Sequence, residues 1–167
     1  MTYLLIFLGL AARLLPHSAN FTPVGAIGLF GGAQLPKRLA LALPLIAVFI
    51  SDLIIGFYTW QVMLSVYLGF LVYGLAGLWI RQDYSIKRMV AGTLGASVFF
   101  FLLTNAAVWA FTPLYPHTLT GLSESYLAAL PFFRNSLLGD FFYTGAFFGV
   151  YELTRFWVAD RVSFARR

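Results

Sequence analysis

Several polar and ionisable residues interrupt otherwise apolar stretches of this sequence. Residues 131–149, PFFRNSLLGDFFYTGAFFG, place Arg134, Asn135 and Asp140 within seven residues of a run rich in Phe, Leu and Gly. An ionisable side chain at membrane depth costs about 2.5–3.5 kcal/mol on insertion scales, so it normally faces a protein interior or a cavity. The chemistry available to such groups is recognition of a polar molecule, or pairing between helices.

Helical spacing groups these residues further. Ser136, Asp140 and Tyr143 follow an i, i+4, i+7 pattern and share one helix face, and Asn105 and Trp109 are one turn apart. These groups lie toward the same end of different apolar segments, so we expect them to meet in a pocket. The predicted substrate-binding residues are Arg13, His17, Asn20, Asp52, Asn105, Trp109, Arg134, Asn135, Asp140 and Tyr143.

Each candidate also has a structural alternative. Asp52 and Asp140 could pair with Arg13 and Arg134, which would lock helices together without a ligand. Asn105 could hold two helices by an interhelical hydrogen bond. A histidine in a loop is more often solvated than ligand-bound, and Trp or Tyr near a helix end is typical of an interfacial belt.

The composition indicates the class of protein. Of the 167 residues, 60% are apolar and 10% are charged, and the mean hydropathy is +0.83. Soluble domains have about 25% charged residues, so we predict a polytopic membrane protein with an all-α fold.

Known reactive motifs are missing from the sequence. There is no Cys, which excludes disulfides and thiolate metal sites. There is no H-E-x-x-H, no G-x-S-x-G and no acidic cluster with metal spacing. We therefore expect no enzyme activity, no metal and no cofactor.

Apolar segment lengths predict the helices. A spanning helix needs about 20 apolar residues. The start, MTYLLIFLGLAARLL, has no basic residue before its apolar run, so we expect a helix and not a cleavable signal. The first two segments are short, and a re-entrant hairpin is the alternative to two spans. We predict one domain, residues 1–167, with a surface helix at 119–130 and six transmembrane helices at 2–15, 22–34, 38–59, 61–81, 88–111 and 132–157.

The basic residues predict the orientation. With six spans, the inner loops and the C-terminal end would hold nine Lys and Arg, against Arg13 and Arg134 outside. Such a bias is typical of cytoplasmic loops. Both termini are expected in the cytoplasm, in a bacterial inner membrane. The net charge of +5 is then explained by topology and anionic lipid, and no nucleic-acid partner is expected.

Glycines recur in two of the segments. PVGAIGLFGGA, residues 23–33, contains four glycines, and Gly145 and Gly149 form a G-x-x-x-G step. Small residues let membrane helices approach closely. Close packing is the first interpretation, and a moving interface is the second.

Four motifs carry a family resemblance: NFTPVGAIGLFGGA (20–33), SDLIIGF (51–57), TNAAVW (104–109) and NSLLGDFFYT (135–144). Together they resemble a family of small bacterial membrane proteins assigned to transport without an established function. More distantly, the layout is similar to the S components, the substrate-binding subunits of energy-coupling factor (ECF) vitamin transporters. The likeness includes a basic inner turn, PKR at 36–38. It implies an outward-facing pocket and capture of a vitamin-like molecule, followed by toppling of the subunit.

Details of this resemblance leave alternatives open. S components often carry an A-x-x-x-A stripe in their first helix, which residues 2–15 lack, so both an ECF-type ATPase module and a solitary transporter are possible. The many Phe and Tyr residues could suit a corrinoid, with His17 or His117 near its metal. The alternative function is a structural membrane scaffold of the cell-shape type, which would bind protein partners and no small molecule.

Overall fold

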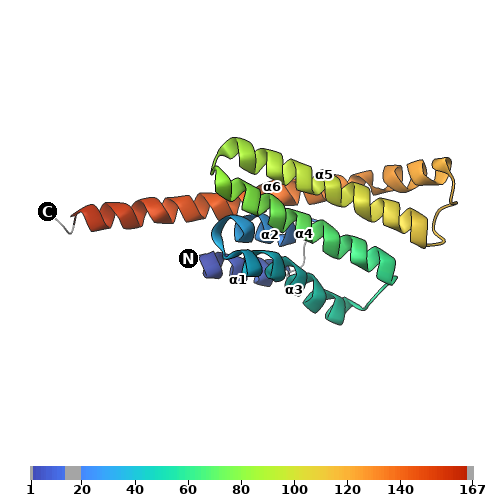
Figure 1. Cartoon of the computed structure of the whole chain (residues 1–167), viewed down its shortest axis with the longest axis horizontal. Helices are drawn as coiled ribbons and strands as arrows, with labels where there is room; N and C mark the ends of the chain where they lie inside the picture. Colours follow the sequence, from blue (N-terminus) through green and yellow to red (C-terminus); the bar gives the residue numbers. More distant parts are fainter. Residues whose placement is uncertain (1, 14–19, 165–167) are drawn as a thin grey trace.

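The computed structural model describes residues 2–13 and 20–164, and this part of the chain folds into helices joined by short connections (Figure 1). The predicted all-α fold is confirmed, since the described residues contain no strand. The six helices are α1 (Thr2–Arg13), α2 (Val24–Gln34), α3 (Lys37–Ile55), α4 (Trp60–Gln82), α5 (Ile86–Phe111) and α6 (Leu119–Phe164).

Helix α2 forms the centre of the bundle. Its residues 24–33 are all buried, and it packs against α1, α3, α4, α5 and α6. Phe30 is fully buried and contacts the rings of Phe147 and Phe148 on α6, at centroid distances of 5.8 and 5.3 Å. The helix is apolar on every side, as expected of a helix enclosed by others.

Glycines bring α2 and α4 into backbone contact. A Cβ on Gly32 would lie 2.7 Å from the Cα of Gly77, and a Cβ on Gly77 would overlap the carbonyl oxygen of Leu29. Gly28 similarly faces Tyr73. The prediction that the glycines of this segment serve close packing is therefore confirmed at Gly28 and Gly32.

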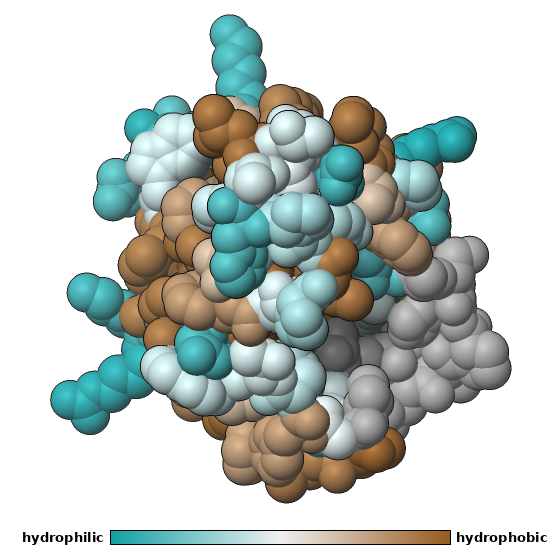
Figure 2. All heavy atoms as spheres, turned by 90° about the vertical axis from the view of Figure 1, so that its right-hand side faces the viewer, coloured by the Kyte–Doolittle hydropathy of each residue, from teal (hydrophilic) through white to brown (hydrophobic). Residues whose placement is uncertain are grey.

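The helices alternate in direction, so the connections fall at two ends (Figure 1). The α2–α3 and α4–α5 connections lie at one end, which we call the basic end because Lys37, Arg38, Arg81, Lys87 and Arg88 flank them. The α3–α4 and α5–α6 connections lie at the other, the aromatic end, whose helix ends and connections carry aromatic residues: Tyr58, Trp60, Trp109 and Tyr115. Figure 2 shows the aromatic end, with pale and teal residues across its centre and brown residues toward its rim.

The expected six transmembrane helices are not supported. Within the described residues, α4 and α5 are long and apolar enough to cross a membrane. Helices α1 and α2 have 12 and 11 residues, which gives about 18 and 16 Å at 1.5 Å per residue, well short of a hydrocarbon core of about 30 Å.

The predicted surface helix at 119–130 is not a separate element. It continues into the following segment as one helix of 46 residues, α6, with Pro131 in its interior. A proline removes one backbone hydrogen bond but need not end a helix whose flanking turns are held by neighbouring helices. The C-terminal part of α6 extends beyond the bundle at the basic end (Figure 1).

Gly77→Ala should destabilise the bundle, because the added Cβ would overlap the Leu29 carbonyl oxygen. Overpacking a filled interior costs about 1–3 kcal/mol, and a backbone atom cannot move aside as a side chain can. Gly95→Ala is the matched control, since no atom from another part of the described structure lies within 4 Å of its Cβ position. Thermal unfolding in one detergent should show a lower midpoint for Gly77→Ala only. Equal midpoints would contradict the close α2–α4 contact.

Candidate functional site

Asp140 of α6 lies at a junction of four helices. It is 4% exposed, and its Oδ2 accepts hydrogen bonds from Tyr73 Oη of α4 at 2.5 Å and Ser97 Oγ of α5 at 2.7 Å. Helix α2 completes the enclosure at Gly25, where a Cβ would overlap Asp140 Oδ1. A buried carboxylate needs hydrogen-bond donors to offset lost hydration, and here two different helices supply them.

Ser97 links this carboxylate to its own helix. Its Oγ lies 2.7 Å from Asp140 Oδ2 and 2.8 Å from the carbonyl oxygen of Thr93. A hydroxyl has one proton, so Ser97 donates to one acceptor at a time. If Asp140 accepted a hydrogen bond from another donor, the Ser97 hydroxyl could rotate and donate to the Thr93 carbonyl oxygen instead.

The proposed pairing of Asp140 with Arg134 is not observed. Arg134 is exposed, and no ion pair joins Asp140 to any residue that the structure describes. The two residues are six positions apart, which places them about 120° apart around a helix of 3.6 residues per turn. When Asp140 points into the bundle, Arg134 must point away from it. The side chain of Arg13 and all of His17 fall outside the described residues.

A cavity lined by both polar and aromatic side chains lies beside this network, between α5 and α6 toward the aromatic end, and we call it the polar cavity. Its volume is about 130 Å³, and Ser97 forms part of its wall. Asn20 and Asn105, two of the predicted binding residues, line it together, and Asn20 has a positive φ of 62°. The other lining residues are Phe100, Phe101, Thr104, Ala129, Phe132, Phe133 and Ser136.

The polar groups that line the cavity differ in the hydrogen bonds that they can still form. Asn105 Nδ2 donates to Phe101 O at 2.8 Å, within its own helix, so this amide nitrogen is not the interhelical clamp considered from the sequence. Thr104 and Ser136 donate to carbonyl oxygens one turn back, at 2.8 and 3.1 Å. Their oxygen lone pairs remain acceptors, and the Asn105 amide nitrogen has a second N–H to donate, so the cavity suits a polar molecule with hydrogen-bond donors and acceptors.

Asp52 belongs to a second, separate pair. It is 6% exposed, and its Oδ2 accepts a hydrogen bond from Tyr67 Oη at 2.9 Å. This contact joins α3 to α4, and Asp52 does not line the polar cavity. The two carboxylates predicted to share one site are therefore held by two tyrosines of α4 in different places.

Three further predicted residues lie away from the cavity wall. Trp109 Nε1 donates to Pro116 O at 3.0 Å and so holds the α5–α6 connection. Tyr143 packs on Phe21 at a centroid distance of 5.6 Å. Asn135 is half-buried and is not part of the cavity lining. Trp109 and Tyr143 share a helix face with the lining residues Asn105 and Ser136 but lie one or two turns away along the helix axis, whereas Asn135, next to Ser136 in sequence, lies about 100° around the helix from it.

Tyr73 and Ser97 were missed as site residues. Ser97 carries a signal, because Thr93, Ser97, Phe101 and Asn105 are spaced by four and form one stripe on α5. Tyr73 carries none that distinguishes it from the other tyrosines of α4. Within the described residues, no three His, Asp or Glu side chains come together in a group that could hold an ion.

Tyr73→Phe should destabilise the protein by about 1.5–3 kcal/mol, the range for a hydrogen bond to a charged group. The change removes a donor from buried Asp140 and leaves the ring packing intact. Tyr126→Phe is the control, because its hydroxyl is exposed and donates to a backbone carbonyl, Leu102 O. Thermal unfolding should show a drop in midpoint several times larger for Tyr73→Phe. Similar drops would mean that Asp140 does not depend on Tyr73.

Comparison with known proteins gave one result. Curated proteins gave no match, and solved structures gave no match. Residues 1–161 match the DUF6580 family, which is described as a family of unknown function. This match covers nearly the whole chain, and the chain belongs to the DUF6580 family.

Proposed function

We propose that this chain is a multi-pass protein of the bacterial inner membrane that captures a small molecule at its aromatic end for uptake. The supporting observation is the polar cavity, whose wall contains Ser97, the donor to buried Asp140. Asp140 itself is buried and does not line the cavity, so the groups that would meet a ligand there are the polar lining residues Asn20, Thr104, Asn105 and Ser136. Ionisable residues at membrane depth are functional-site candidates by default.

The molecular surface supports a membrane location. Large apolar side chains are exposed on several helices, among them Phe7 of α1 at 66%, Ile54 of α3 at 70% and Phe142 of α6 at 61%. Apolar surface on this scale is expected where lipid replaces water. The basic end would then face the cytoplasm, in keeping with the bias of Lys and Arg toward that side.

The size of the cavity limits what it holds in this conformation. Ligand pockets typically measure about 300–1,000 Å³, and this cavity has about 130 Å³. A vitamin-like molecule, and still more a corrinoid, requires α5 and α6 to separate at the aromatic end. We propose that uptake includes such an opening, by an S-component-like subunit acting with or without an ATPase module.

A second candidate function is a structural membrane scaffold. The observation that favours it is the C-terminal part of α6, which extends beyond the bundle (Figure 1). Leu153, Phe156 and Trp157 are 62%, 71% and 64% exposed there. Exposed apolar groups on a helix that extends beyond the bundle favour contact with a protein partner. Recovery of wall-synthesis proteins by crosslinking would favour this function.

The uptake proposal predicts a ligand that stabilises the purified protein. A panel of thiamine, pyridoxine, riboflavin and biotin can be tested by thermal shift, together with native mass spectrometry for co-purified metabolites. A ligand at 100 times its Kd should stabilise by about 2.7 kcal/mol. Ser136→Leu, which fills the cavity, should abolish the shift.

Ser123→Leu is the matched control for this experiment. Ser123 also lies on α6 and also donates to a carbonyl oxygen one turn back, but it is exposed and away from the cavity. It should keep the shift. Equal loss in both variants would contradict the cavity as the site, and the absence of any panel or co-purified ligand would contradict capture.

Cysteine labelling tests the orientation independently of any ligand. The sequence has no Cys, so single substitutions can be labelled without background. In intact cells with a permeable outer layer, a membrane-impermeant maleimide should label Tyr115→Cys at the aromatic end. Lys87→Cys at the basic end should be labelled only after the inner membrane is opened. The reverse pattern would contradict the proposed orientation.

A further inference from the structure

The hydrogen bond between Ser97 and Asp140 crosses the interface that the proposed opening separates. Ser97 lies on α5 and Asp140 on α6, and Ser97 Oγ is 2.7 Å from Asp140 Oδ2. Ser97 also forms part of the wall of the polar cavity. Movement of α5 away from α6 must therefore break this bond, and it brings the Asp140 carboxyl group into contact with the cavity.

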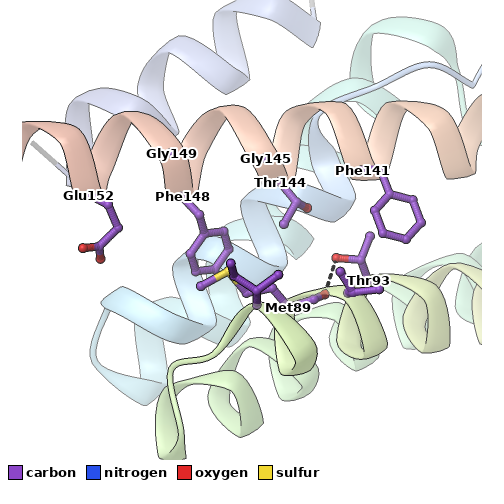
Figure 3. Close-up of a pocket in the computed structure, with 10 residues that line it drawn as sticks. Met89, Thr93, Phe141, Thr144, Gly145, Phe148, Gly149 and Glu152 are labelled. Carbon is purple, nitrogen blue, oxygen red and sulfur yellow. Dashed lines mark hydrogen bonds between the residues drawn. The ribbon is translucent and has the colours of Figure 1, made fainter.

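The glycine pair of α6 does not hold this helix in place. No atom from elsewhere in the described structure lies within 4 Å of a Cβ built on Gly145 or Gly149 (Figure 3). Gly32 and Gly77, by contrast, touch the facing backbone. The expected close packing at the G-x-x-x-G step is therefore absent within the described fold, and α6 is freer to move against α5 than α4 is against α2.

The groups that face Asp140 are uncharged. Tyr73 comes from α4, Ser97 from α5 and Gly25 from α2, and no ion pair reaches Asp140 within the described residues. Tyr73 is the titratable side chain that contacts it in this part of the structure. Burial without a cation disfavours the charged form of a carboxyl group, whereas contact with water favours it. The charge of Asp140 is therefore linked to whether the α5–α6 interface is closed or open.

Ser97 can serve both forms of this carboxyl group. Its Oγ lies within hydrogen-bond distance of Asp140 Oδ2 and, at 2.8 Å, of Thr93 O. When Asp140 is ionised, Ser97 donates to it. When Asp140 is protonated, Asp140 donates to Ser97, and the Ser97 proton turns to Thr93 O. Both arrangements use the same positions of the heavy atoms, so Asp140 can gain or lose a proton without repacking of the helices.

Neighbouring groups lack this combination of features. Thr93 Oγ1 donates within its own helix, to Met89 O at 2.8 Å (Figure 3). Asp52, the other buried carboxylate among the described residues, does not line or adjoin the polar cavity through such a hydroxyl, since its partner is Tyr67. Asp140 is thus the described carboxyl group that is both buried and joined to a cavity by a hydroxyl with two acceptors.

The polar cavity gives protons a route to Ser97. Its volume of about 130 Å³ exceeds the roughly 30 Å³ that one water molecule occupies in the liquid. Asn20 is exposed, and Thr104 and Ser136 are half-buried, so the cavity reaches the surface and offers hydrogen bonds to water. A hydronium ion there can lose a proton to Ser97 Oγ while the original Ser97 O–H bond breaks and an O–H bond forms on Asp140 Oδ2. One proton moves, and Ser97 is unchanged.

We propose that Asp140 is a proton-binding site coupled to the polar cavity through Ser97. Closure of α5 on α6 excludes water and takes up one proton on Asp140 from the aromatic end, and opening releases it to the same side. A small molecule captured by closure is then captured together with a proton, which would supply the coupling ion for a transporter that acts without an ATPase module. This role in uptake rests on the proposed function, whereas proton binding by Asp140 does not.

Infrared difference spectroscopy of the full chain in detergent tests proton binding. Acidification from about pH 8 to about pH 4, the range around carboxyl titration, should produce the C=O band of a protonated carboxyl group in wild type. Asp140→Asn keeps a side-chain oxygen for Tyr73 and Ser97 but cannot titrate, so it should lack part of this band. The chain has six Asp and Glu, and the difference between wild type and the variant isolates Asp140.

Ser97→Ala should move the midpoint of this band upward by about one pH unit, because the ionised form loses a donor. Ser65→Ala is the matched control, since Ser65 is also buried and donates within its own helix, to Val62 O, but does not line the polar cavity. Its midpoint should equal that of wild type. The shift also assigns the band to Asp140 if Asp140→Asn does not fold. A wild-type chain without the band, or equal midpoints in the two Ser variants, would overturn the proposal.

Maleimide labelling tests the link between this proton and opening. Thr104→Cys lies in the cavity wall, and Ser123→Cys is exposed outside it, so the ratio of their labelling rates removes the ordinary effect of pH on a thiol. The ratio should rise with pH by up to about tenfold per unit, the limit for one linked proton. In the Asp140→Asn background it should not vary with pH.

A ratio with the same pH dependence in both backgrounds would overturn the coupling of Asp140 to the cavity. Neither the infrared measurement nor the labelling uses a ligand. A proton site that fails is therefore distinguished from a failure of the uptake proposal, which the ligand panel tests.

Discussion

Burial of the Asp140 carboxylate is the constraint on which the arrangement of the helices depends. A carboxylate taken out of water is tolerated only where donors replace its hydration. Tyr73 and Ser97 supply them from α4 and α5, and Gly25 makes room on α2. Each of these helices must hold one register relative to α6 for the contacts to form. The same group that fixes the bundle is thus the group beside the polar cavity.

The glycines of α2 and α4 make this burial possible. Helix α2 is too short to cross a membrane, yet it reaches five other helices because it lies at the centre. Contact between Gly32 and Gly77 brings α4 close to α2, and this closeness places Tyr73 within reach of Asp140. Small residues at such a crossing let the two backbones come into van der Waals contact. The contact between Gly32 and Gly77 therefore sets both the packing of α4 on α2 and the position of Tyr73 beside Asp140.

Sequence reasoning predicted the helical class, the approximate position of most helices, and Asp140, Asn20 and Asn105 as neighbours of one region. It failed where the outcome depends on helix face or on distant partners. Arg134 is close to Asp140 in sequence but about 120° away around the helix, a difference that spacing alone could have revealed. Tyr73 is 67 positions from Asp140, and nothing local to either residue predicts their contact. The continuity of α6 through Pro131 depends on neighbouring helices and is equally invisible in the sequence.

A second cavity, which we call the apolar groove, lies nearer the basic end between residues 86–93 of α5 and residues 141–152 of α6 (Figure 3), so it shares its pair of helices with the polar cavity. Thr93 lines the groove, Ser97 lines the cavity, and these residues are one turn apart on α5, joined by the bond from Ser97 Oγ to Thr93 O. Two packed helices cannot separate at one end without changing their contact at the other. An opening at the aromatic end that admits a larger ligand must therefore alter the groove. Any molecule bound in the groove would favour one of the two arrangements, since a ligand shifts an equilibrium by its differential affinity for the two states.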